Sequence, residues 1–357
     1  MTTRSVISCD EALRDLASFD AVLDVRSETE FAEDHVPGAI NYPVLHDAER
    51  AEVGTLHKQV SAFAARRRGA ALIARNIAHI LETHLTAMPR EWAPLVYCWR
   101  GGQRSGALTH VLERIGWRVR QLEGGYRAYR RRVLADLEQW PQRFEFRVIC
   151  GTTGSGKSRL LQHLAAAGAQ VLDLEAMAHH RGSVLGGLPS QPQPSQKMFE
   201  SRIWDALRGF SPRAPVFVES ESRKVGNLRL PDALLAAIRQ SECIRLELPL
   251  GERVALLRDE YRHFEQRPDE LAAQLDCLRA LHGAQRIAQW KALAAGGQWE
   301  QLVERLLVEH YDPAYQNSIA RNFIRAGQAR VLRLPSRAPA AYAAAARELL
   351  EAQRAAA

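Results

Sequence analysis

Cysteine is scarce in this chain, which has five cysteines among 357 residues. They lie far apart in the sequence, at Cys9, Cys98, Cys150, Cys243 and Cys277. This spacing excludes a zinc site built on C-x2-C pairs, and it gives no disulfide framework of the kind found in small secreted domains. We therefore expect reduced thiols, and a cysteine in an unusual setting deserves a chemical explanation.

Long apolar segments are also missing. No run approaches the roughly 18 residues that span a bilayer, and the opening stretch MTTRSVISCDEALRDL lacks the apolar core of a secretory signal. These absences and the unpaired cysteines predict a cytoplasmic protein without membrane association. The hydrophobic content of 46% is that of an ordinary globular protein, and 357 residues suggest two domains.

Acidic side chains are in the minority, with 41 Asp and Glu against 48 Lys and Arg, and the formal net charge is +7. Arginine clusters supply much of the excess, in AARRRGA (64–70) and YRAYRRRV (126–133). One such cluster is more often a solvated helix face than a binding site. Several of them in one chain favour a polyanionic partner, most simply nucleic acid.

Short β-like runs alternate with helical stretches through the first 125 residues. The pattern predicts strands at 21–26, 94–98 and 118–125, and helices at 27–35 and 104–117. Such alternation is typical of a parallel sheet covered by helices. We assign residues 1–125 to a first α/β domain and the Arg-rich, helical segment 126–143 to a linker.

The remaining residues, 144–357, open as a strand, a glycine-rich loop and a helix (157–167). Further strands are predicted at 214–220 and 243–249, and the pattern after residue 250 is helical nearly to the end. We expect HYDPAYQNS (310–318) to interrupt these helices and the Ala-rich tail (338–357) to form a surface helix that frays. The second domain is therefore predicted to be α/β with a helical C-terminal part.

The stretch VYCWRGGQRSG (96–106) places Cys98 between a predicted strand and a predicted helix. A thiol is nucleophilic only as the thiolate, which nearby cations and oriented N–H groups stabilise. The loop and the helix N-terminus supply such groups, and two glycines allow the tight turn. We predict Cys98 as the catalytic nucleophile. The rest of the active-site loop is Arg100, Gly101, Gly102, Gln103, Arg104 and Ser105.

The spacing C-x5-R also fits cysteine phosphatases, so the upstream residues matter. LDVRSETEFAEDHVPGAINYP (23–43) resembles the signature of rhodanese-type sulfurtransferases, with Asp24 and Arg26 at a strand end. A phosphatase of the tyrosine type normally has His before the cysteine, where this chain has Tyr97. The pattern favours a rhodanese-like domain, in which we expect Asp24 and Arg26 to hold the loop by hydrogen bonds.

The stretch GTTGSGKS fits the phosphate-loop pattern G-x-x-x-x-G-K-[ST], with a predicted strand before it and a helix after it. Its backbone N–H groups and Lys157 would hold a diphosphate, and Ser158 could ligate Mg²⁺. The predicted diphosphate-binding residues are Gly151, Thr152, Thr153, Gly154, Ser155, Gly156, Lys157 and Ser158. A nucleotide hydrolase would need a further acidic residue, for which Asp173 and Glu219 are candidates.

A rhodanese-like domain followed by a phosphate-loop domain resembles the tRNA 2-selenouridine synthase family, also called tRNA 2-thiouridine selenotransferases. The two loops are specific only as a pair, but longer stretches extend the resemblance over nearly the whole chain. These are EVGTLHKQ (52–59), LEGGYRAYR (122–130), HHRGSVLGG (179–187), QPSQKMFES (193–201), VFVESESRKVGN (216–227) and HYDPAY (310–315).

The resemblance implies a transferase that acts on tRNA carrying a 5-substituted 2-thiouridine at the wobble position. Geranyl diphosphate would first alkylate the sulfur, and selenium from selenophosphate would then replace the thiogeranyl group, leaving 2-selenouridine. The phosphate loop would hold the diphosphate, with Mg²⁺ at Ser158, and Cys98 would receive or pass on the chalcogen. The implied partners are tRNA and selenophosphate synthase, and no tightly bound cofactor is expected.

Several assignments remain open at this point. Arg181 contacts the diphosphate or tRNA, or is a surface residue, and Glu219 and Glu221 orient a metal or Lys157, or cap strand ends. Trp99 and Tyr126 either stack on the wobble base or belong to the core. The alternative functions are an ATP-dependent tRNA sulfurtransferase or kinase, and a thiol-bearing carrier that is not an enzyme.

Overall fold

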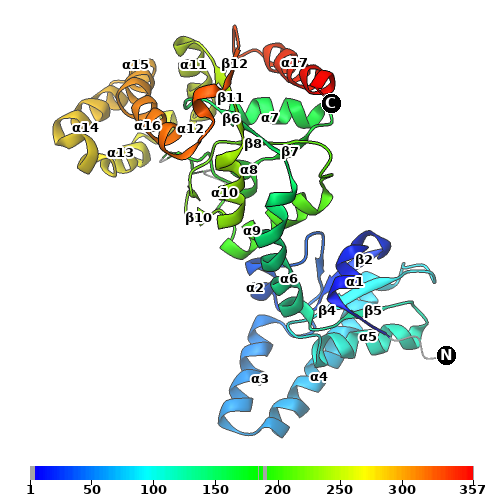
Figure 1. The fold of residues 1–357 in the computed structure, drawn as a ribbon. Helices are drawn as coiled ribbons and strands as arrows, with labels where there is room; N and C mark the ends of the chain where they lie inside the picture. Colours follow the sequence, from blue (N-terminus) through cyan, green and yellow to red (C-terminus); the bar gives the residue numbers. More distant parts are fainter. Residues whose placement is uncertain (1–4, 184, 188–190, 357) are drawn as a thin grey trace. The chain divides into compact units, whose positions relative to one another are not determined.

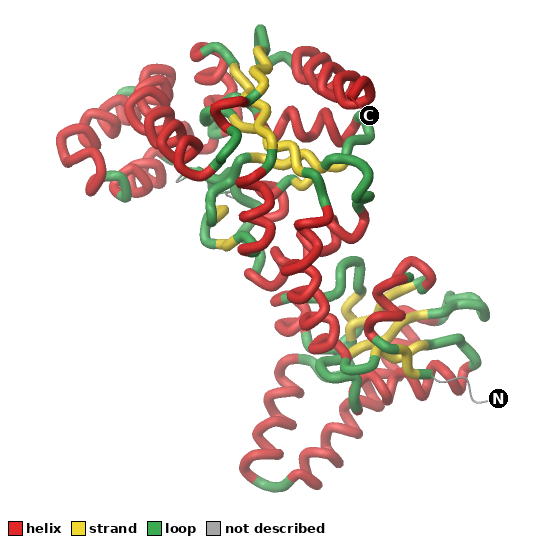
Figure 2. Tube along the Cα trace, viewed as in Figure 1, coloured by secondary structure: helices red, strands yellow, loops and turns green. Residues whose placement is uncertain are grey.

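The computed structural model describes residues 5–183, 185–187 and 191–356. The chain divides into two compact units, each built on its own five-stranded sheet (Figures 1 and 2). The first unit is Met1–Asp136 with Ser195–Asp205, and the second is Leu137–Pro194 with Ala206–Ala357. Over the described residues, no helix is long and apolar enough to cross a membrane.

The first unit has a fully parallel sheet. In spatial order its strands are β1 (Val6–Ile7), β5 (Arg120–Leu122), β4 (Pro94–Tyr97), β2 (Ala21–Asp24) and β3 (Ile40–Asn41). Its helices are α1 (Cys9–Arg14), α2 (Glu28–Glu33), α3 (Asp47–Gln59), α4 (Ala62–Ile80), α5 (Gln103–Ile115) and α6 (Gly125–Gln139). Since the strands are parallel, the residues that follow β2 and β4 meet at one edge of the sheet.

Segment 126–143 consists of most of α6 and a 3₁₀ turn, Trp140–Arg143. The α6 helix packs against the first part of α9 (Gln196–Gly209), which lies far away in the sequence. The indole N–H of Trp204 donates to Asp136 at 2.9 Å, and the Trp204 ring meets the edge of Tyr129. This contact explains why Ser195–Asp205 folds as part of the first unit.

The second unit also has a parallel sheet, with the strand that precedes the phosphate loop at its centre. The strand order is β12 (Arg330–Arg333), β11 (Glu242–Glu247), β6 (Phe146–Cys150), β8 (Val216–Glu219) and β7 (Gln170–Leu172). The helices around it are α7 (Lys157–Ala166), α8 (Leu174–Ala178), α10 (Asp232–Gln240) and α11 (Leu250–Glu260), and a hairpin joins β9 (Lys224–Val225) to β10 (Leu228–Arg229). The predicted α/β class is confirmed in both units.

A helical subdomain follows α11. It comprises α12 (His263–Gln266), α13 (Pro268–Asp276), α14 (Arg279–Ala295), α15 (Trp299–Leu306) and α16 (Asp312–Asn322). The prediction of an interruption at 310–318 is wrong, because a π-helical turn, Leu307–Tyr311, continues directly into α16. The proline of HYDPAY lies in the first turn of α16, where its missing N–H leaves no hydrogen bond unmade. Strand β12, at the sheet edge, was not predicted.

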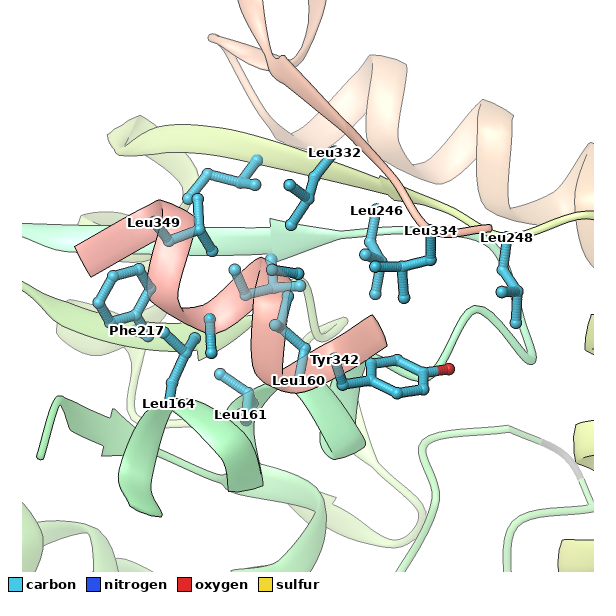
Figure 3. Packing of buried hydrophobic residues seen from close by; sticks show 14 of the residues in the cluster. Leu160, Leu161, Leu164, Phe217, Leu246, Leu248, Leu332, Leu334, Tyr342 and Leu349 are labelled. Carbon is cyan, nitrogen blue, oxygen red and sulfur yellow. The ribbon is translucent and has the colours of Figure 1, made fainter. Parts of the chain in front are cut away.

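The Ala-rich tail forms α17 (Pro339–Ala356), which confirms the predicted helix, although the burial of one of its faces was not predicted. One face of α17 packs against α7 and the sheet, burying Tyr342, Ala345, Ala346 and Leu349 (Figure 3). Alanines at helical spacing allow two helices to approach closely. The composition of the segment alone does not show whether such alanines are buried or exposed. The tail therefore belongs to the core that supports the phosphate loop.

Candidate functional site

Cys98 lies directly after β4, in the loop that leads into α5, and its side chain is 3% exposed. The backbone around it is tightly packed. A Cβ on Gly101, whose φ is +65°, would lie 2.5 Å from the carbonyl oxygen of Leu122, and one on Gly125 would lie 2.2 Å from that of Cys98. Only glycine fits at these two positions, which explains the Gly-rich loop and the GG pair after β5.

Hydrogen bonds favour the thiolate of Cys98. Burial alone would raise the pKa of the thiol, but the Ser105 hydroxyl and backbone N–H groups of Ser105, Arg100 and Gly102 outweigh burial, so the pKa is lowered. The Ser105 Oγ donates to the sulfur at 3.2 Å. The side-chain amide of Gln121, on β5, donates to Ser105 Oγ at 2.9 Å and to the Gly101 carbonyl at 2.7 Å. Sequence reasoning missed Gln121.

The arginines of the loop differ in position. Arg104 makes two hydrogen bonds to Glu30, at 2.7 and 3.3 Å, and Glu30 also belongs to the capping box of α2. Arg104 therefore ties α5 to α2 rather than contacting the sulfur. Arg100 has an exposed side chain and supports Cys98 through its backbone N–H. Gln103 is exposed at the first position of α5.

Asp24 and Arg26 form a buried ion pair at 2.6 Å. Arg26 also donates to the carbonyl of Asp34 at 2.6 Å, and its guanidinium lies 4.0 Å from the centroid of the Tyr126 ring. Tyr126 is buried, donates to Asp34 at 2.8 Å and stacks on Trp99. The pair thus fixes the scaffold on which the residue after Cys98 rests.

The phosphate loop connects β6 to α7, and its glycines are required by close contacts. Gly154 and Gly156 have φ of +78° and +81°. A Cβ on Gly156 would lie 2.1 Å from the hydroxyl of Tyr342, which itself donates to the Ser155 carbonyl at 3.4 Å. Lys157 Nζ donates to the Gly151 carbonyl at 3.0 Å. Thr152 lies in the turn that Ser155 N closes by donating to its carbonyl.

Residues from α11 and from the helical subdomain hold this loop. Arg253, on α11, is 6% exposed and donates to the Thr153 carbonyl from two nitrogens, at 2.9 and 2.8 Å. Its other contacts are with Asp312, at 3.0 and 2.6 Å. The Tyr315 hydroxyl accepts from Gly151 N at 2.5 Å. The HYDPAY stretch thus holds the phosphate loop in place through Asp312 and Tyr315, a role that its sequence alone did not indicate.

Four carboxyl groups gather beside Lys157 and Ser158. Ser158 Oγ donates to Glu175 at 2.8 Å, and Glu175 N donates to Glu219 at 2.8 Å. The cluster is Asp173, Glu175, Glu219 and Glu221, and burial raises the pKa of all four. Neighbouring carboxylates raise the pKa further for the three glutamates, and that of Glu221 rises to about 8.

The members of the cluster have different roles. Asp173 is the N-cap of α8, and its side chain accepts a hydrogen bond from Ala176 N at 2.8 Å. Glu175, which sequence reasoning did not single out, is the carboxylate that reaches Ser158. Within the described ranges, no three His, Cys, Asp or Glu side chains form a ready metal site. The Ser158 hydroxyl and these carboxylates are nevertheless oxygen ligands of the type that Mg²⁺ prefers.

A cavity of about 640 Å³ opens over the loop. Its cationic lining residues are Lys157, Arg159 and Arg181. Arg181 donates to the Glu260 carbonyl at 3.0 Å and lies over the ring of Tyr261 at 4.7 Å, so its side chain is held at the cavity wall. The structure therefore brings Arg181 and Glu221 to the phosphate loop.

A second, smaller pocket of about 70 Å³ adjoins this cavity and is almost entirely apolar. The two share Thr153, Ser183, Leu257, Tyr261 and Tyr311 as lining residues. The further walls of the small pocket are Leu185, Phe264, Leu271, Trp299, Leu302, Val303, Leu306 and Leu307, with Arg258 and Glu265. A ligand whose charged end lies on the phosphate loop would thus meet hydrocarbon next to it.

A cysteine loop on one parallel sheet and a phosphate loop on another define a class of two-module proteins that join a rhodanese-like domain to a phosphate-binding domain. The rhodanese-like domain family matches residues 8–132. The family described as tRNA 2-selenouridine synthase AAA domain matches residues 144–282.

Curated relatives named tRNA 2-selenouridine synthase match over much of the chain. The protein from Nitrosomonas europaea is 37% identical over 67% of this chain and 63% of its own length. Those from Marinobacter nauticus and Bdellovibrio bacteriovorus are each 31% identical, over 84% and 85% of this chain and 88% and 90% of their own lengths. The chain belongs to the tRNA 2-selenouridine synthase family, which confirms the resemblance stated from its residues.

Among solved structures, a rhodanese-related protein from Thermoplasma volcanium is 18% identical over 36% of this chain and 93% of its own, with a TM-score of 0.25. The family assignment rests on the sequence matches alone.

Proposed function

We propose that this chain is a tRNA-modifying transferase that converts wobble 5-substituted 2-thiouridine to 2-selenouridine in two steps. In the first step the thiocarbonyl sulfur attacks the first carbon of geranyl diphosphate, the C–O bond breaks, and diphosphate leaves with the electron pair. In the second step selenium from selenophosphate becomes bonded to C2 of the base, the C2–S bond breaks and geranyl thiol leaves. Water takes up the phosphoryl group of selenophosphate, so no oxidant or reductant is needed.

The observation that carries the proposal is the apolar pocket next to the phosphate-loop cavity. Geranyl diphosphate has a strongly charged end and a hydrocarbon end. The cavity suits the charged end, and the apolar pocket of about 70 Å³ has room for part of the hydrocarbon chain, the rest of which would lie against the walls that the two spaces share. Adenine, by contrast, presents several hydrogen-bonding atoms that a wall of leucines and Trp299 would leave unpaired. The loop N–H groups and Lys157 would stabilise the charge that the departing diphosphate gains.

Charge balance supports Mg²⁺ in the first step. Asp173, Glu175 and Glu221 line the cavity beside Lys157. Burial raises the pKa of all three, and repulsion from a neighbouring carboxylate adds to the rise for Glu175 and Glu221. A bound diphosphate adds further negative charge, which a divalent cation would offset. Ser158 and Glu175 are the residues that would hold the ion. The ion would neutralise negative charge on the leaving diphosphate.

The second step is assigned to Cys98. Its loop lowers the thiol pKa through Ser105 and three backbone N–H groups, which is the setting of a reactive cysteine. The same N–H groups can bind the phosphate oxygens of selenophosphate, because a loop that stabilises a thiolate also stabilises other anions. Selenophosphate synthase is the proposed supplier of this donor.

Exposed arginines are proposed to hold the tRNA by its phosphates. In the 126–133 cluster, Arg130 pairs with Glu200 and Arg132 pairs with Asp136, so these two serve the fold. Arg127 and Arg131 remain exposed in that cluster, and Arg66 and Arg67 in the other. The wobble nucleotide must leave its stack to reach either loop, as bases do in other base-modifying enzymes.

Nucleoside mass spectrometry on tRNA carrying 2-thiouridine tests the proposal. Wild-type protein with geranyl diphosphate should yield S-geranyl-2-thiouridine, and added selenophosphate should convert it to 2-selenouridine. If the tRNA changes only when ATP is supplied, the loop is a nucleotide site and an ATP-dependent sulfurtransferase or kinase replaces the proposal. If the tRNA is unchanged in every mixture, the chain is a thiol-bearing carrier instead.

A further inference from the structure

A large groove in the first unit takes no part in the account above. It has a volume of about 1280 Å³ and is bounded by α3, α4 and α5. One end is formed by Trp99, Gln103 and Arg104, which belong to the Cys98 loop. The groove therefore begins at the residue next to the proposed nucleophile.

Its walls are apolar because α4 carries small or aliphatic side chains on one face. The lining positions recur at helical spacing: Ala70, Ile73, Ala74, Ile77, Ala78 and Leu81. Leu72 and Ile80, on another face of α4, are buried in the first unit. Ala70, Ala74 and Ala78 are exposed along the groove, whereas Ile77 is buried in the core of the first unit.

Basic side chains outnumber acidic ones along the groove. Its lining includes Arg50, Arg66 and Arg104 with His57 and His110, while Glu30 and Glu33 supply the opposite charge. Arg50 and Arg104 share one acidic partner, Glu30, at 3.4 and 2.7 Å. The combination of a hydrocarbon floor with a cationic rim suits a ligand that has an apolar chain attached to a polyanion.

We propose that this groove receives the alkyl group on the sulfur of S-alkylated thiouridine while C2 of that base is presented to the Cys98 loop. The inference rests on the proposed function, and it adds a second prenyl site to the one beside the phosphate loop. The alkyl group remains attached to the leaving sulfur until the second step, so it must lie close to Cys98 when selenium enters. A geranyl chain of ~10 carbons needs about 300 Å³, if each carbon group takes as much room as a water molecule in the liquid. The groove accommodates this volume.

Filling the groove while varying the alkyl group tests the inference. The variants are Ala70→Phe and Ala74→Phe, and the matched control is Ala71→Phe, since Ala71 is an exposed alanine of the same helix that does not line the groove. Each protein receives selenophosphate and tRNA whose 2-thiouridine has been either S-geranylated or S-methylated. The readout is the rate of 2-selenouridine formation by nucleoside mass spectrometry.

We expect Ala70→Phe and Ala74→Phe to slow selenation of the S-geranyl tRNA about tenfold or more, with the S-methyl tRNA little affected and the control unchanged. Equal rates for all variants on both tRNAs would overturn the inference and leave the proposed function standing. An equal loss on both tRNAs would also overturn it, because the groove would then serve another ligand, such as a selenium-delivering protein. Wild-type protein that selenates neither tRNA would overturn the proposed function itself.

Discussion

The hydroxyl of Ser105 lies 3.2 Å from the sulfur of Cys98 and donates to it. Ser105 is fully buried on the first turn of α5, and Gln121 on β5 fixes its oxygen from the other side. A sulfur that is 3% exposed would ordinarily stay protonated, since burial disfavours its charged form. This relay of two side chains therefore helps to make a buried cysteine a nucleophile.

Replacing Ser105 should move the pH dependence of selenation. In Ser105→Ala the thiolate loses a donor, so the pKa of Cys98 rises and the acid limb of the pH–rate profile shifts to higher pH. At pH values below that limb we expect the rate of selenation to fall about tenfold, which is the effect of losing one hydrogen bond to a charged group. Gln121→Met should shift the limb in the same direction by less. A uniform loss at every pH would mean that Ser105 acts only on the fold.

The contact between Gly156 and Tyr342 makes a prediction about the phosphate loop. In Gly156→Ala the new Cβ would collide with the Tyr342 hydroxyl, so we expect inorganic diphosphate to bind at least about tenfold more weakly by calorimetry. Gly168→Ala is the matched control, because Gly168 also has a positive φ, +88°, but has open space around its Cβ position. Equal affinities of the two variants for diphosphate would contradict an effect of the collision on the phosphate loop.

The carboxyl cluster predicts that stability falls as pH rises. Burial and Glu175 raise the pKa of Glu221 to about 8 from an ordinary value of 4.5, against the opposing effect of Lys157. The folded state therefore binds a proton more tightly than the unfolded state, and the resulting stabilisation is complete below pH 4.5 and lost as pH rises through about 8.

Thermal unfolding of wild type and Glu221→Gln at pH 5.5 and 8 checks this prediction. Between these two pH values the Tm of the wild type should fall by a few °C more than the Tm of the variant. Mg²⁺ added with diphosphate should reduce the loss of Tm in the wild type, since the cation then offsets the carboxylate charge that the proton neutralises at lower pH. Parallel Tm curves for the two proteins would contradict a raised pKa at Glu221.

The C-terminal helix should contribute strongly to stability. Leu349 is 4% exposed in the cluster that joins α17 to α7, so Leu349→Ala should lower the free energy of unfolding by about 2–5 kcal/mol. Arg347→Ala, at an exposed position on the same helix, should change it by less than about 0.5 kcal/mol. Urea denaturation of both variants measures the difference, and similar midpoints would place α17 outside the core.

Both loops could be predicted from sequence because each is a local pattern. Glycines, a preceding strand and a following helix determine where Cys98 and Lys157 lie, and all of these are neighbours in the chain. Gln121, Arg253 and Tyr315 could not be found in this way, since each reaches its loop from a distant element. Glu175 could have been, because it follows β7 by three residues and such strand ends face the phosphate loop in parallel sheets.

The predictions about the fold also succeeded where a local pattern decides and failed where contacts between distant elements decide. Strands with buried, β-branched runs were predicted within a few residues, whereas β12 was missed because it is a short edge strand with only two apolar residues between two arginines. The stretch 310–318, where an interruption was expected, contains one proline, which helices accept in their first turn. Burial of α17 depends on its packing against α7 and the sheet, which only the folded structure reveals.

The most direct test of the central claim separates the two loops in one experiment. Cys98→Ser and Lys157→Ala are each given two substrates, tRNA with 2-thiouridine plus geranyl diphosphate, and tRNA already S-geranylated plus selenophosphate. We predict that Cys98→Ser geranylates but does not selenate, and that Lys157→Ala fails to geranylate but selenates the prepared tRNA. If either substitution abolishes both reactions in a protein that remains folded, the two steps do not belong to separate loops and the account is wrong.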